Sequence, residues 1–392
     1  MTTTTPHDEA ADLRRRLADS LTSGGALSHT SPWHKAFAAV SREAFVPRFS
    51  VRSGGELRSF GAKDAEYLAV VYSDDTLVTR RDEAGTPVSS SSTPSLMARM
   101  LEAFTVADGA QVLEIGTGTG YNSALLCHRL GSENVTTIDV DPDLTATARE
   151  RLAVIGYTPL VVTSDGTRAY TTGARYDGVL ATCGVDRVPA AWVRQVRPGG
   201  VIVTNIGDGI VRLVVDGDGT ARGGFLPDEA SFMRARPTAD HVAPTAPEFT
   251  GLVVNGKGVA RTVDVPVPDD DEHDEMVDRV KAFFGEFVHR PALEIGMLQH
   301  DVLAMTLDPE GDTMHGLVHP ESGSWARITP RAGARALVEY GGPRDLVTER
   351  LALTTQWLAA GRPHLGAYTL AVTADGAHTL SRAEPAARSW AL

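Results

Sequence analysis

The sequence is poor in cysteine and in long apolar runs, and each shortage excludes a class of protein. Cys127 and Cys183 are too few for a disulfide scaffold, and the first residues lack the apolar core of a signal peptide. We therefore expect a protein of the reducing cytoplasm. No apolar run reaches the roughly 18 residues that a membrane-spanning helix needs, so no membrane partner is expected.

Basic residues are also in short supply, with 37 Lys and Arg against 50 Asp and Glu and a formal net charge of -13. This balance disfavours a nucleic acid partner, because like charge repels a phosphate backbone. The 12 histidines lack the spacing of a zinc site, so no metal is expected. Apolar residues are plentiful at 42% of 392 positions, enough for two or three domains with their own cores.

Between residues 111 and 206 short β-rich runs alternate with helical segments, a pattern typical of βαβ units in a parallel sheet. The predicted strands cover residues 112–115, 135–138, 160–163, 176–181 and 200–206. The predicted helices cover residues 121–130, 142–155 and 189–195. The fold class is therefore α/β, with an open doubly wound sheet.

The segment before this sheet has a weaker pattern. We expect two short helices within residues 13–51, then a long loop over residues 53–92 that ends in a serine-rich turn. Pro94 suits the first turn of a helix, and apolar residues follow it at helical spacing. The chain thus enters the sheet through helices.

The alternation ends after Gly207, and six of the seven residues at 269–275 are acidic. We place the domain boundary between residues 224 and 225, so that residues 1–224 form the first domain and residues 225–392 an additional C-terminal α+β domain. The elements predicted in this domain are a helix over 276–288, a strand over 336–340, a helix over 344–360 and strands over 368–373 and 378–382.

The strongest local pattern is VLEIGTGTGY over residues 112–121, where a buried strand meets a glycine-rich turn and then a helix. Glycines let the turn approach a ligand closely. A dinucleotide fingerprint starting at Gly116 would need a sixth-position glycine, which is Tyr121 here, so an NAD-dependent dehydrogenase is disfavoured. Asp139 and Asp165 follow the next two strands and could accept from ribose hydroxyls and an adenine amine. Together they predict an adenosine pocket.

These residues resemble class I AdoMet-dependent methyltransferases, and more specifically the protein-L-isoaspartate O-methyltransferase family. SREAFVPRF at 41–49 is similar to the family's PREhFVP segment, and VYSDDTL at 71–77 to its YxDxxLP segment. SSTPSLMARMLE at 91–102 resembles the segment that carries the active-site serine. The resemblance covers residues 10–210 and implies a Rossmann-like fold with N-terminal helices.

The resemblance also implies a role for individual residues. S-adenosyl-L-methionine is the implied cofactor and S-adenosyl-L-homocysteine its product. The implied cofactor-binding residues are Glu114, Gly116, Thr117, Gly118, Gly120, Asp139, Val140, Asp165 and Gly166. Ser92 corresponds to the catalytic serine, and Ser90, Ser91 and Thr93 beside it are the expected substrate contacts.

The chain is longer than the repair enzymes of that family and carries four consecutive serines. In these features it resembles actinobacterial methyltransferases encoded beside lanthipeptides and other ribosomally made peptides. The resemblance implies methylation of one aspartate in a precursor peptide that already carries modifications, leading to a succinimide. The alternative is an isoaspartate repair enzyme with an accessory domain. A binding module without catalysis is disfavoured, because Ser92, the glycine turn and Asp139 are all present.

Overall fold

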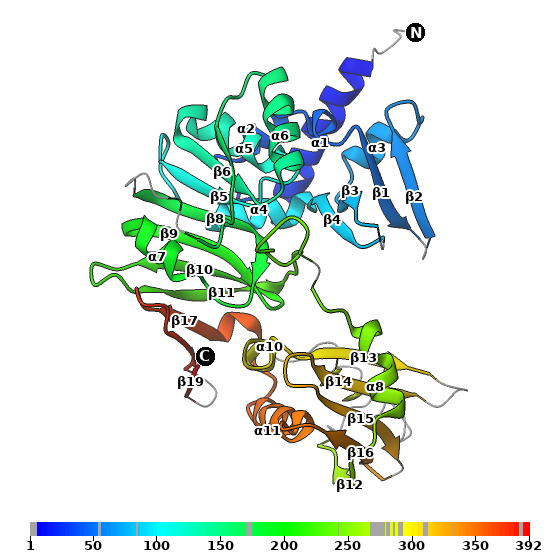
Figure 1. Ribbon diagram of the computed structural model, residues 1–392. Coiled ribbons are helices and arrows are strands. Elements are labelled where there is room, and N and C mark those ends of the chain that lie inside the picture. Colours follow the sequence, from blue (N-terminus) through cyan, green and yellow to red (C-terminus); the bar gives the residue numbers. More distant parts are fainter. Residues whose placement is uncertain are drawn as a thin grey trace. The chain divides into compact units, whose positions relative to one another are not determined.

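The computed structural model divides the chain into two compact units, both drawn in Figure 1. The first unit consists of Met1–His241 and Thr369–Thr379, and the second of Val242–Tyr368 and Leu380–Leu392. The structure describes residues 6–53, 56–83, 85–168, 170, 175–241, 243–266, 279, 283–284, 287–288, 293–308, 313–331, 333–383 and 387–392.

The sheet of the first unit has the predicted doubly wound core, with strands in the order β9-β8-β5-β6-β7, all parallel. Its strands are β5 (Val112–Ile115), β6 (Val135–Asp139), β7 (Leu160–Thr163), β8 (Tyr176–Val185) and β9 (Val196–Ile206). The helices between them are α5 (Tyr121–Leu130), α6 (Pro142–Val154) and α7 (Ala190–Gln195). These elements confirm the predicted α/β alternation, and β8 and β9 are longer than expected.

The same sheet continues beyond Gly207, where the sequence pattern predicted its end. β10 (Gly209–Val215) pairs antiparallel with β9 and with β11 (Ala221–Glu229). The predicted boundary between residues 224 and 225 therefore falls inside a strand, and the first unit continues to His241. A hairpin lacks the helical crossover of a βαβ unit, so the loss of alternation marked a change of strand direction and not the end of the domain.

A late segment of the chain extends this sheet. β17 (Tyr368–Val372), which the sequence placed in the second domain, pairs antiparallel with β11, with Ala221 opposite Val372. A hydrogen bond also links the residues after β17 to the first unit, because the Val188 N–H donates to His378 Nε2 at 3.0 Å. Burial lowers the pKa of His378, which suits a neutral ring nitrogen that accepts. Residues 369–379 are thus an integral part of the first unit.

The N-terminal region contains a second, smaller sheet where a long loop was predicted. Its four strands run in the order β2-β1-β3-β4. They are β1 (Arg48–Ser53), β2 (Glu56–Gly61), β3 (Leu77–Arg81) and β4 (Pro87–Ser91). Five of the six residues of β2 are exposed or half-buried, so these strands lack the apolar alternation that makes a strand visible in a sequence.

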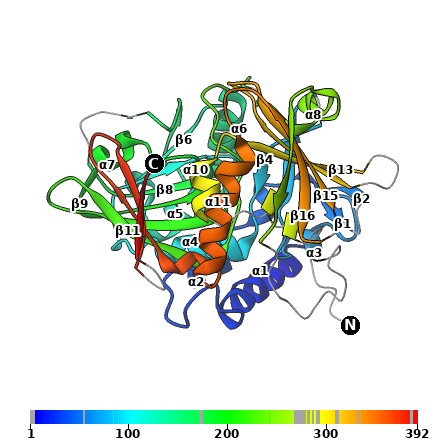
Figure 2. The ribbon, with the colours of Figure 1, turned by 90° about the horizontal axis from the view of Figure 1, so that it is seen from below.

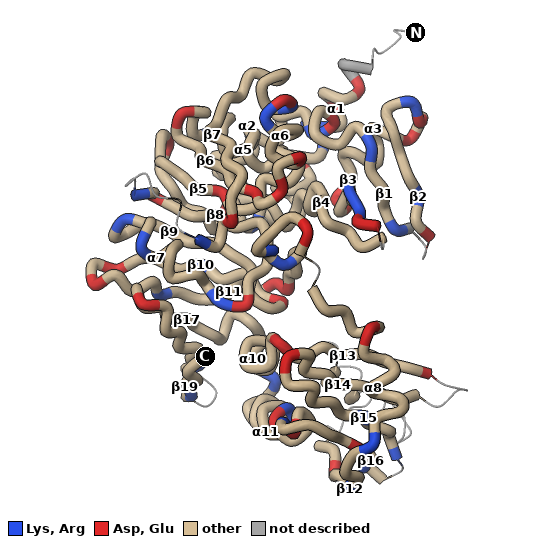
Figure 3. Tube along the Cα trace, in the orientation of Figure 1, with Lys and Arg blue, Asp and Glu red and all other residues tan. Residues whose placement is uncertain are grey.

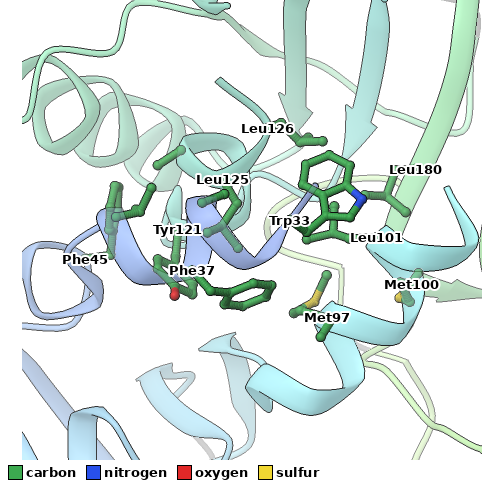
Figure 4. Close-up of a cluster of buried hydrophobic side chains, with 14 of the residues drawn as sticks. Trp33, Phe37, Phe45, Met97, Met100, Leu101, Tyr121, Leu125, Leu126 and Leu180 are labelled. Atoms are coloured by element: carbon green, nitrogen blue, oxygen red, sulfur yellow. The ribbon is translucent and has the colours of Figure 1, made fainter. Parts of the chain in front are cut away.

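The N-terminal region also contains four helices. They are α1 (Pro6–Ser23), α2 (His34–Ala39), α3 (Tyr67–Val71) and α4 (Pro94–Ala103). Phe37 and Phe45 point at the ring of Tyr121, the first residue of α5, with centroids 6.5 and 5.9 Å away (Figure 4). This contact ties the N-terminal helices to the helix that follows the glycine turn.

The second unit contains a five-stranded antiparallel sheet in the order β12-β16-β15-β14-β13. Its strands are β12 (Val259–Asp264), β13 (Leu303–Leu307), β14 (Met314–His319), β15 (Ser324–Arg331) and β16 (Arg335–Gly341). Its helices include α8 (Thr250–Asn255), α10 (Leu293–Leu298) and α11 (Leu346–Ala359), and β18 (His378–Arg382) and β19 (Arg388–Ala391) follow late in the chain. The strand predicted at 336–340 and the helix predicted at 344–360 are confirmed.

Helices cover both faces of this sheet (Figure 2). Leu317 packs into a cluster with Leu346 of α11, whereas its neighbour Val318 packs with Val253 of α8. Successive strand residues point to opposite faces, so the two clusters are two cores. The acidic segment at 269–275 and most of the helix predicted at 276–288 lie outside the described residues.

Charged residues of both signs are interspersed along both units, as Figure 3 shows. Within the residues that the structure describes, no helix is long and apolar enough to cross a membrane.

Candidate functional site

The turn between β5 and α5 contains three glycines with positive φ angles, 96° at Gly116, 51° at Gly118 and 92° at Gly120. L side chains rarely adopt this backbone. The space is also tight, because a Cβ added at Gly116 would lie 2.9 Å from Thr182 Oγ1, and one at Gly120 would lie 3.2 Å from Ala148 Cβ. Glycine is therefore required here. The turn is also held by its own backbone, because the Gly116 N–H donates to the Ile138 carbonyl oxygen at 2.8 Å and the Gly120 N–H to the Thr117 carbonyl oxygen at 2.9 Å.

Asp139 ends β6 and contacts this glycine turn. Its Oδ2 accepts from the Gly118 N–H at 2.9 Å and its Oδ1 from the Asp141 N–H at 3.1 Å. Each carboxylate oxygen can accept two hydrogen bonds, so one position on each stays available. Burial raises the pKa of Asp139, and the two backbone donors oppose that rise. Val140 follows, half-buried. The carboxylate is suited to two neighbouring hydroxyl groups, as on a ribose.

The loop after β7 reaches the same edge of the sheet. A Cβ added at Gly166 would lie 2.5 Å from Ile115 Cγ2, at the end of β5. The Ser164 N–H donates to the Asp139 carbonyl oxygen at 2.9 Å. The structure thus brings together the glycine turn, Asp139 and the Asp165–Gly166 pair, as the sequence predicts for an adenosine pocket.

Asp165 is more heavily engaged by its own chain than Asp139 is. Its Oδ1 accepts from the Thr167 N–H at 2.9 Å and the Thr167 hydroxyl at 2.6 Å, and its Oδ2 from Arg168 Nε at 3.1 Å. The Gly166 carbonyl oxygen accepts from Trp192 Nε1 at 2.7 Å. These contacts fix the loop, and Asp165 has less acceptor capacity left for a ligand.

The side chains of Glu114 and Thr117, two of the predicted cofactor-binding residues, support the glycine turn from the interior. Glu114 is fully buried, and its carboxylate accepts from Asn122 Nδ2 at 2.7 Å, from the Thr137 hydroxyl at 2.7 Å and from the Ser123 hydroxyl. The Thr117 hydroxyl bonds to that of Thr137 at 2.7 Å. Both side chains are therefore occupied in the interior, and burial raises the pKa of Glu114.

Thr182 is a residue of this site that sequence reasoning missed. It lies in β8, and its hydroxyl donates to the Gly116 carbonyl oxygen at 2.9 Å and to the Ile115 carbonyl oxygen at 3.2 Å. The signal was available, because Thr182 directly follows the predicted strand 176–181 at the ligand-binding edge of a parallel sheet.

The serine turn, residues 90–93, meets the glycine turn at the end of β4. A Cβ added at Gly118 would lie 3.7 Å from the Ser90 carbonyl oxygen. Ser92 and Thr93 are half-buried between β4 and α4, and the Thr93 hydroxyl bonds to that of Thr76 at 2.8 Å. The predicted substrate-binding segment and the predicted cofactor-binding segment therefore lie side by side.

Ser91 differs from Ser90, Ser92 and Thr93 because it is buried. Its side chain is 3% exposed, and its hydroxyl accepts from Nε of the buried Arg42 at 3.2 Å. Sequence reasoning missed Arg42, although it belongs to the segment 41–49 that carried the family resemblance. The Ser91 hydroxyl therefore anchors the turn to Arg42, and its role as a substrate contact stays a prediction.

Both cysteines lie in this unit, and we expect neither to react in the folded protein. Burial raises the pKa of Cys127 from 9.0 to about 12, and burial together with the charge of Asp139 does the same for Cys183. The reactive thiolate is thus about a thousandfold scarcer than at an ordinary cysteine. Ellman's reagent at pH 8 should label no thiol in native protein and two in denaturant. Rapid labelling of the native protein would contradict this placement.

The donor set of the site fits S-adenosylmethionine. A glycine cradle that a Cβ would obstruct, a carboxylate with two free acceptor positions and a second acid on the next strand end match a nucleoside. Among the described residues, no group of three or more His, Cys, Asp or Glu side chains is placed to hold a metal ion.

Comparisons with known proteins agree with this geometry. Residues 60–219 match the family model described as Protein-L-isoaspartate(D-aspartate) O-methyltransferase (PCMT). The protein-L-isoaspartate O-methyltransferase of Ignicoccus hospitalis is 36% identical over 171 residues, which are 43% of this chain and 70% of that protein. The enzyme of the same name from Thermotoga maritima is 31% identical over 196 residues, 50% of this chain and 55% of that protein.

A solved structure titled protein-L-isoaspartate O-methyltransferase has the same fold, with a TM-score of 0.52 and 21% identity over 94% of this chain and 99% of that chain. The relative from Staphylothermus marinus is 30% identical, covering 51% of this chain and 81% of that protein. The chain therefore belongs to the protein-L-isoaspartate O-methyltransferase family and is an S-adenosylmethionine-dependent carboxyl O-methyltransferase with a class I methyltransferase fold.

Proposed function

We propose that this chain methylates the side-chain carboxylate of one aspartate in a ribosomally made, lanthipeptide-like precursor that already carries modifications. Choosing one aspartate in a long peptide needs contacts beyond the carboxylate, and such remote contacts also help to align the reacting groups. The second unit, with its own sheet and two cores, supports the proposal because it offers additional surface for a peptide.

In this proposal Ser92 orients the acceptor. Its hydroxyl donates to one oxygen of the substrate carboxylate while the other oxygen attacks the methyl group. The backbone of Ser92 is held firmly, because its carbonyl oxygen accepts from Arg42 Nη2 at 3.0 Å. Ser90 and Thr93 flank Ser92, and Ser90 lies beside Gly118, so acceptor and cofactor meet at this point.

The cofactor is held in this proposal by the three strand ends that the structure brings together. Asp139 accepts from the two ribose hydroxyls with its free positions. Asp165 and Gly166 border the adenine, and the backbone of 116–120 faces the amino acid part. Glu114, Thr117 and Thr182 act through the glycine turn. The Thr182 hydroxyl bonds to the Gly116 carbonyl oxygen, and Glu114 and Thr117 both bond to the Thr137 hydroxyl.

S-adenosylmethionine supplies a methyl group on a positively charged sulfur. A side-chain carboxyl with a reference pKa near 4 is already ionised at neutral pH, so no residue needs to act as a base. The chain's task is alignment, which can contribute up to roughly 7 to 11 kcal/mol. Charge is neutralised as the methyl group moves, so a site with little water favours the reaction.

The ester formed in this way reacts further without any enzyme group. The backbone nitrogen of the following residue attacks the ester carbonyl, loses its proton and expels methanol, which leaves a five-membered succinimide. Addition of water then opens the ring to aspartate or isoaspartate.

Repair of isoaspartyl proteins is the second candidate, and one observation favours it. The solved structure titled protein-L-isoaspartate O-methyltransferase matches the fold over 94% of this chain, so a second unit also occurs in a protein of that title. A second unit is therefore compatible with either role, and the substrate decides between them.

The full-length enzyme should discriminate between two peptides under identical conditions. We expect a higher kcat/KM for a modified aspartyl precursor peptide than for a short isoaspartyl peptide. We also expect kcat/KM to fall when the precursor is shortened to the residues around its aspartate, because remote contacts are lost. Methyl transfer from labelled S-adenosylmethionine measures both. Faster methylation of the isoaspartyl peptide would establish repair instead.

A further inference from the structure

A buried arginine lies directly under the serine turn. Arg42 opens the 3-10 turn η1 (Arg42–Ala44) and is 0% exposed. Among the described residues no carboxylate lies within ion-pair distance of it, and its guanidinium instead donates to backbone and hydroxyl oxygens. The acceptors are the carbonyls of Val71 (2.8 Å), Ser73 (3.1 Å), Asp75 (3.0 Å), Ser91 (3.3 Å) and Ser92 (3.0 Å) and the Ser91 hydroxyl (3.2 Å).

This arrangement needs an arginine in particular. A guanidinium presents five N–H donors in a rigid planar fork, whereas a lysine has three donors on one nitrogen. Burial lowers the pKa of Arg42 to about 10, so the side chain keeps its charge at neutral pH. Six oxygens from two stretches of chain are therefore held at fixed distances by one planar group.

The stretches that Arg42 joins are the parts of the proposed methyl-transfer site. One is the serine turn, through Ser91 and Ser92. Another is the start of α5, because the guanidinium carbon lies 5.8 Å from the centre of the Tyr121 ring. Tyr121 directly follows Gly120, the last glycine of the cofactor turn. Arg42 thus spans from the acceptor side of the site to the cofactor side.

The third stretch, residues 71–76, makes hydrogen bonds of its own to the serine turn and to the start of α4. Asp74 Oδ1 accepts from the Ser95 N–H at 2.7 Å, in the first turn of α4. The Thr76 hydroxyl bonds to that of Thr93 at 2.8 Å. Since Arg42 in turn holds the carbonyls of this stretch, its loss would loosen both sets of restraints on Ser92.

We infer that Arg42 is a positioning residue for methyl transfer, which fixes Ser92 relative to the glycine turn without touching either reactant. The inference rests on the proposed role of Ser92. It predicts that weakening Arg42 slows the chemical step and leaves the cofactor pocket intact, because Asp139 and the three glycines make no hydrogen bond to Arg42 in the described part of the chain.

Three variants of the full-length enzyme test this inference. Arg42→Lys keeps the charge and loses the fork, and Ser91→Ala removes one acceptor of Arg42 Nε with little risk to folding. Arg350→Lys is the matched control, since Arg350 is also buried, has its pKa lowered to about 10, and donates to Gln299 Oε1 at 2.8 Å in the second unit. The substrate is the short isoaspartyl peptide or the aspartyl precursor, whichever the wild-type enzyme methylates faster.

We expect Arg42→Lys to lower kcat by about 10²-fold, the cost of a small misplacement of reacting groups. Ser91→Ala should lower kcat less, and neither change should alter the affinity for S-adenosylhomocysteine measured by calorimetry. Amide hydrogen exchange should accelerate over residues 91–95 and stay unchanged in β6, which ends at Asp139. Arg350→Lys should lower the melting temperature and leave kcat at the wild-type value.

Wild-type kcat in folded Arg42→Lys would overturn the inference, as would an equal loss of kcat and S-adenosylhomocysteine affinity. If Arg42→Lys does not fold, Ser91→Ala decides, and wild-type kcat and exchange in that variant would overturn the inference. Ser92→Ala, assayed in parallel, separates the two proposals. Full activity of Ser92→Ala would remove Ser92 from the mechanism. If Ser92→Ala is inactive while Arg42→Lys is fully active, only the proposed role of Arg42 is removed.

Discussion

Ser92→Ala should lower kcat about 10²-fold while the affinity for S-adenosylhomocysteine stays at the wild-type value. The reason is that, in the proposed mechanism, Ser92 orients the carboxylate of the substrate, whereas the cofactor is held by the strand ends at 116–120, 139 and 165. The side chain is half-buried and its backbone is fixed by Arg42, so removal of the hydroxyl leaves the turn in place. Single-turnover methylation and calorimetry measure the two quantities separately.

Ser20→Ala is a suitable control for this substitution. Ser20 lies on α1, and its hydroxyl donates to the Leu17 carbonyl oxygen at 2.8 Å, away from the serine turn. It should have wild-type kcat. If Ser92→Ala instead lost cofactor affinity as strongly as rate, Ser92 would shape the pocket, and orientation of the acceptor would fall to Ser90 or Thr93.

Asp139→Ala should weaken S-adenosylhomocysteine binding by about 1.5 to 3 kcal/mol, the range for hydrogen bonds to a charged group. The substitution removes two acceptor positions for the ligand and leaves the Gly118 N–H, which Asp139 holds at 2.9 Å, without its partner. Asp143→Ala removes a charge from the same edge, but its side chain is 82% exposed, so its effect should be small. Unchanged affinity in Asp139→Ala would take Asp139 out of the site.

The raised pKa of Asp139 adds a pH dependence to this expectation. The ionised form accepts from both ribose hydroxyls, and the protonated form loses that capacity. Burial raises the pKa, so wild-type affinity should begin to fall at a higher pH than for an ordinary aspartate as the solution is acidified. Asp139→Ala should lack this acid-side loss, which calorimetry between neutral and acidic pH can follow.

The central sheet could be predicted from the sequence because its strands are buried on both faces. All four residues of β5 are buried, and three of them are apolar, a pattern that is visible without a structure. The strands of the small N-terminal sheet could not be predicted, since β2 is largely exposed. The boundary at residue 224 failed for a different reason, because β17 pairs with β11 from about 150 positions later in the chain, and no local pattern reports a pairing over such a separation.

The candidate site could likewise be predicted only in part. The glycine turn, Asp139 and the Asp165–Gly166 pair were predictable because each ends a strand of a parallel sheet, and those ends meet at one edge. Glu114 and Ser91 were assigned by their position in a motif, but a motif does not say which way a side chain points. Arg42 was missed because its partners are mainly backbone oxygens, which leave no trace in residue types.

The pairing of β17 with β11 also has a consequence for synthesis of the chain on the ribosome. The outer edge of β11 stays unpaired until residues 369–379 emerge, and at roughly 5 to 20 residues per second that delay is on the order of 10 s. In that interval the second unit can fold on itself while the nascent first unit exposes a strand edge, a known route to aggregation. Slow translation or early termination within the second unit should therefore favour insoluble chains over inactive soluble ones.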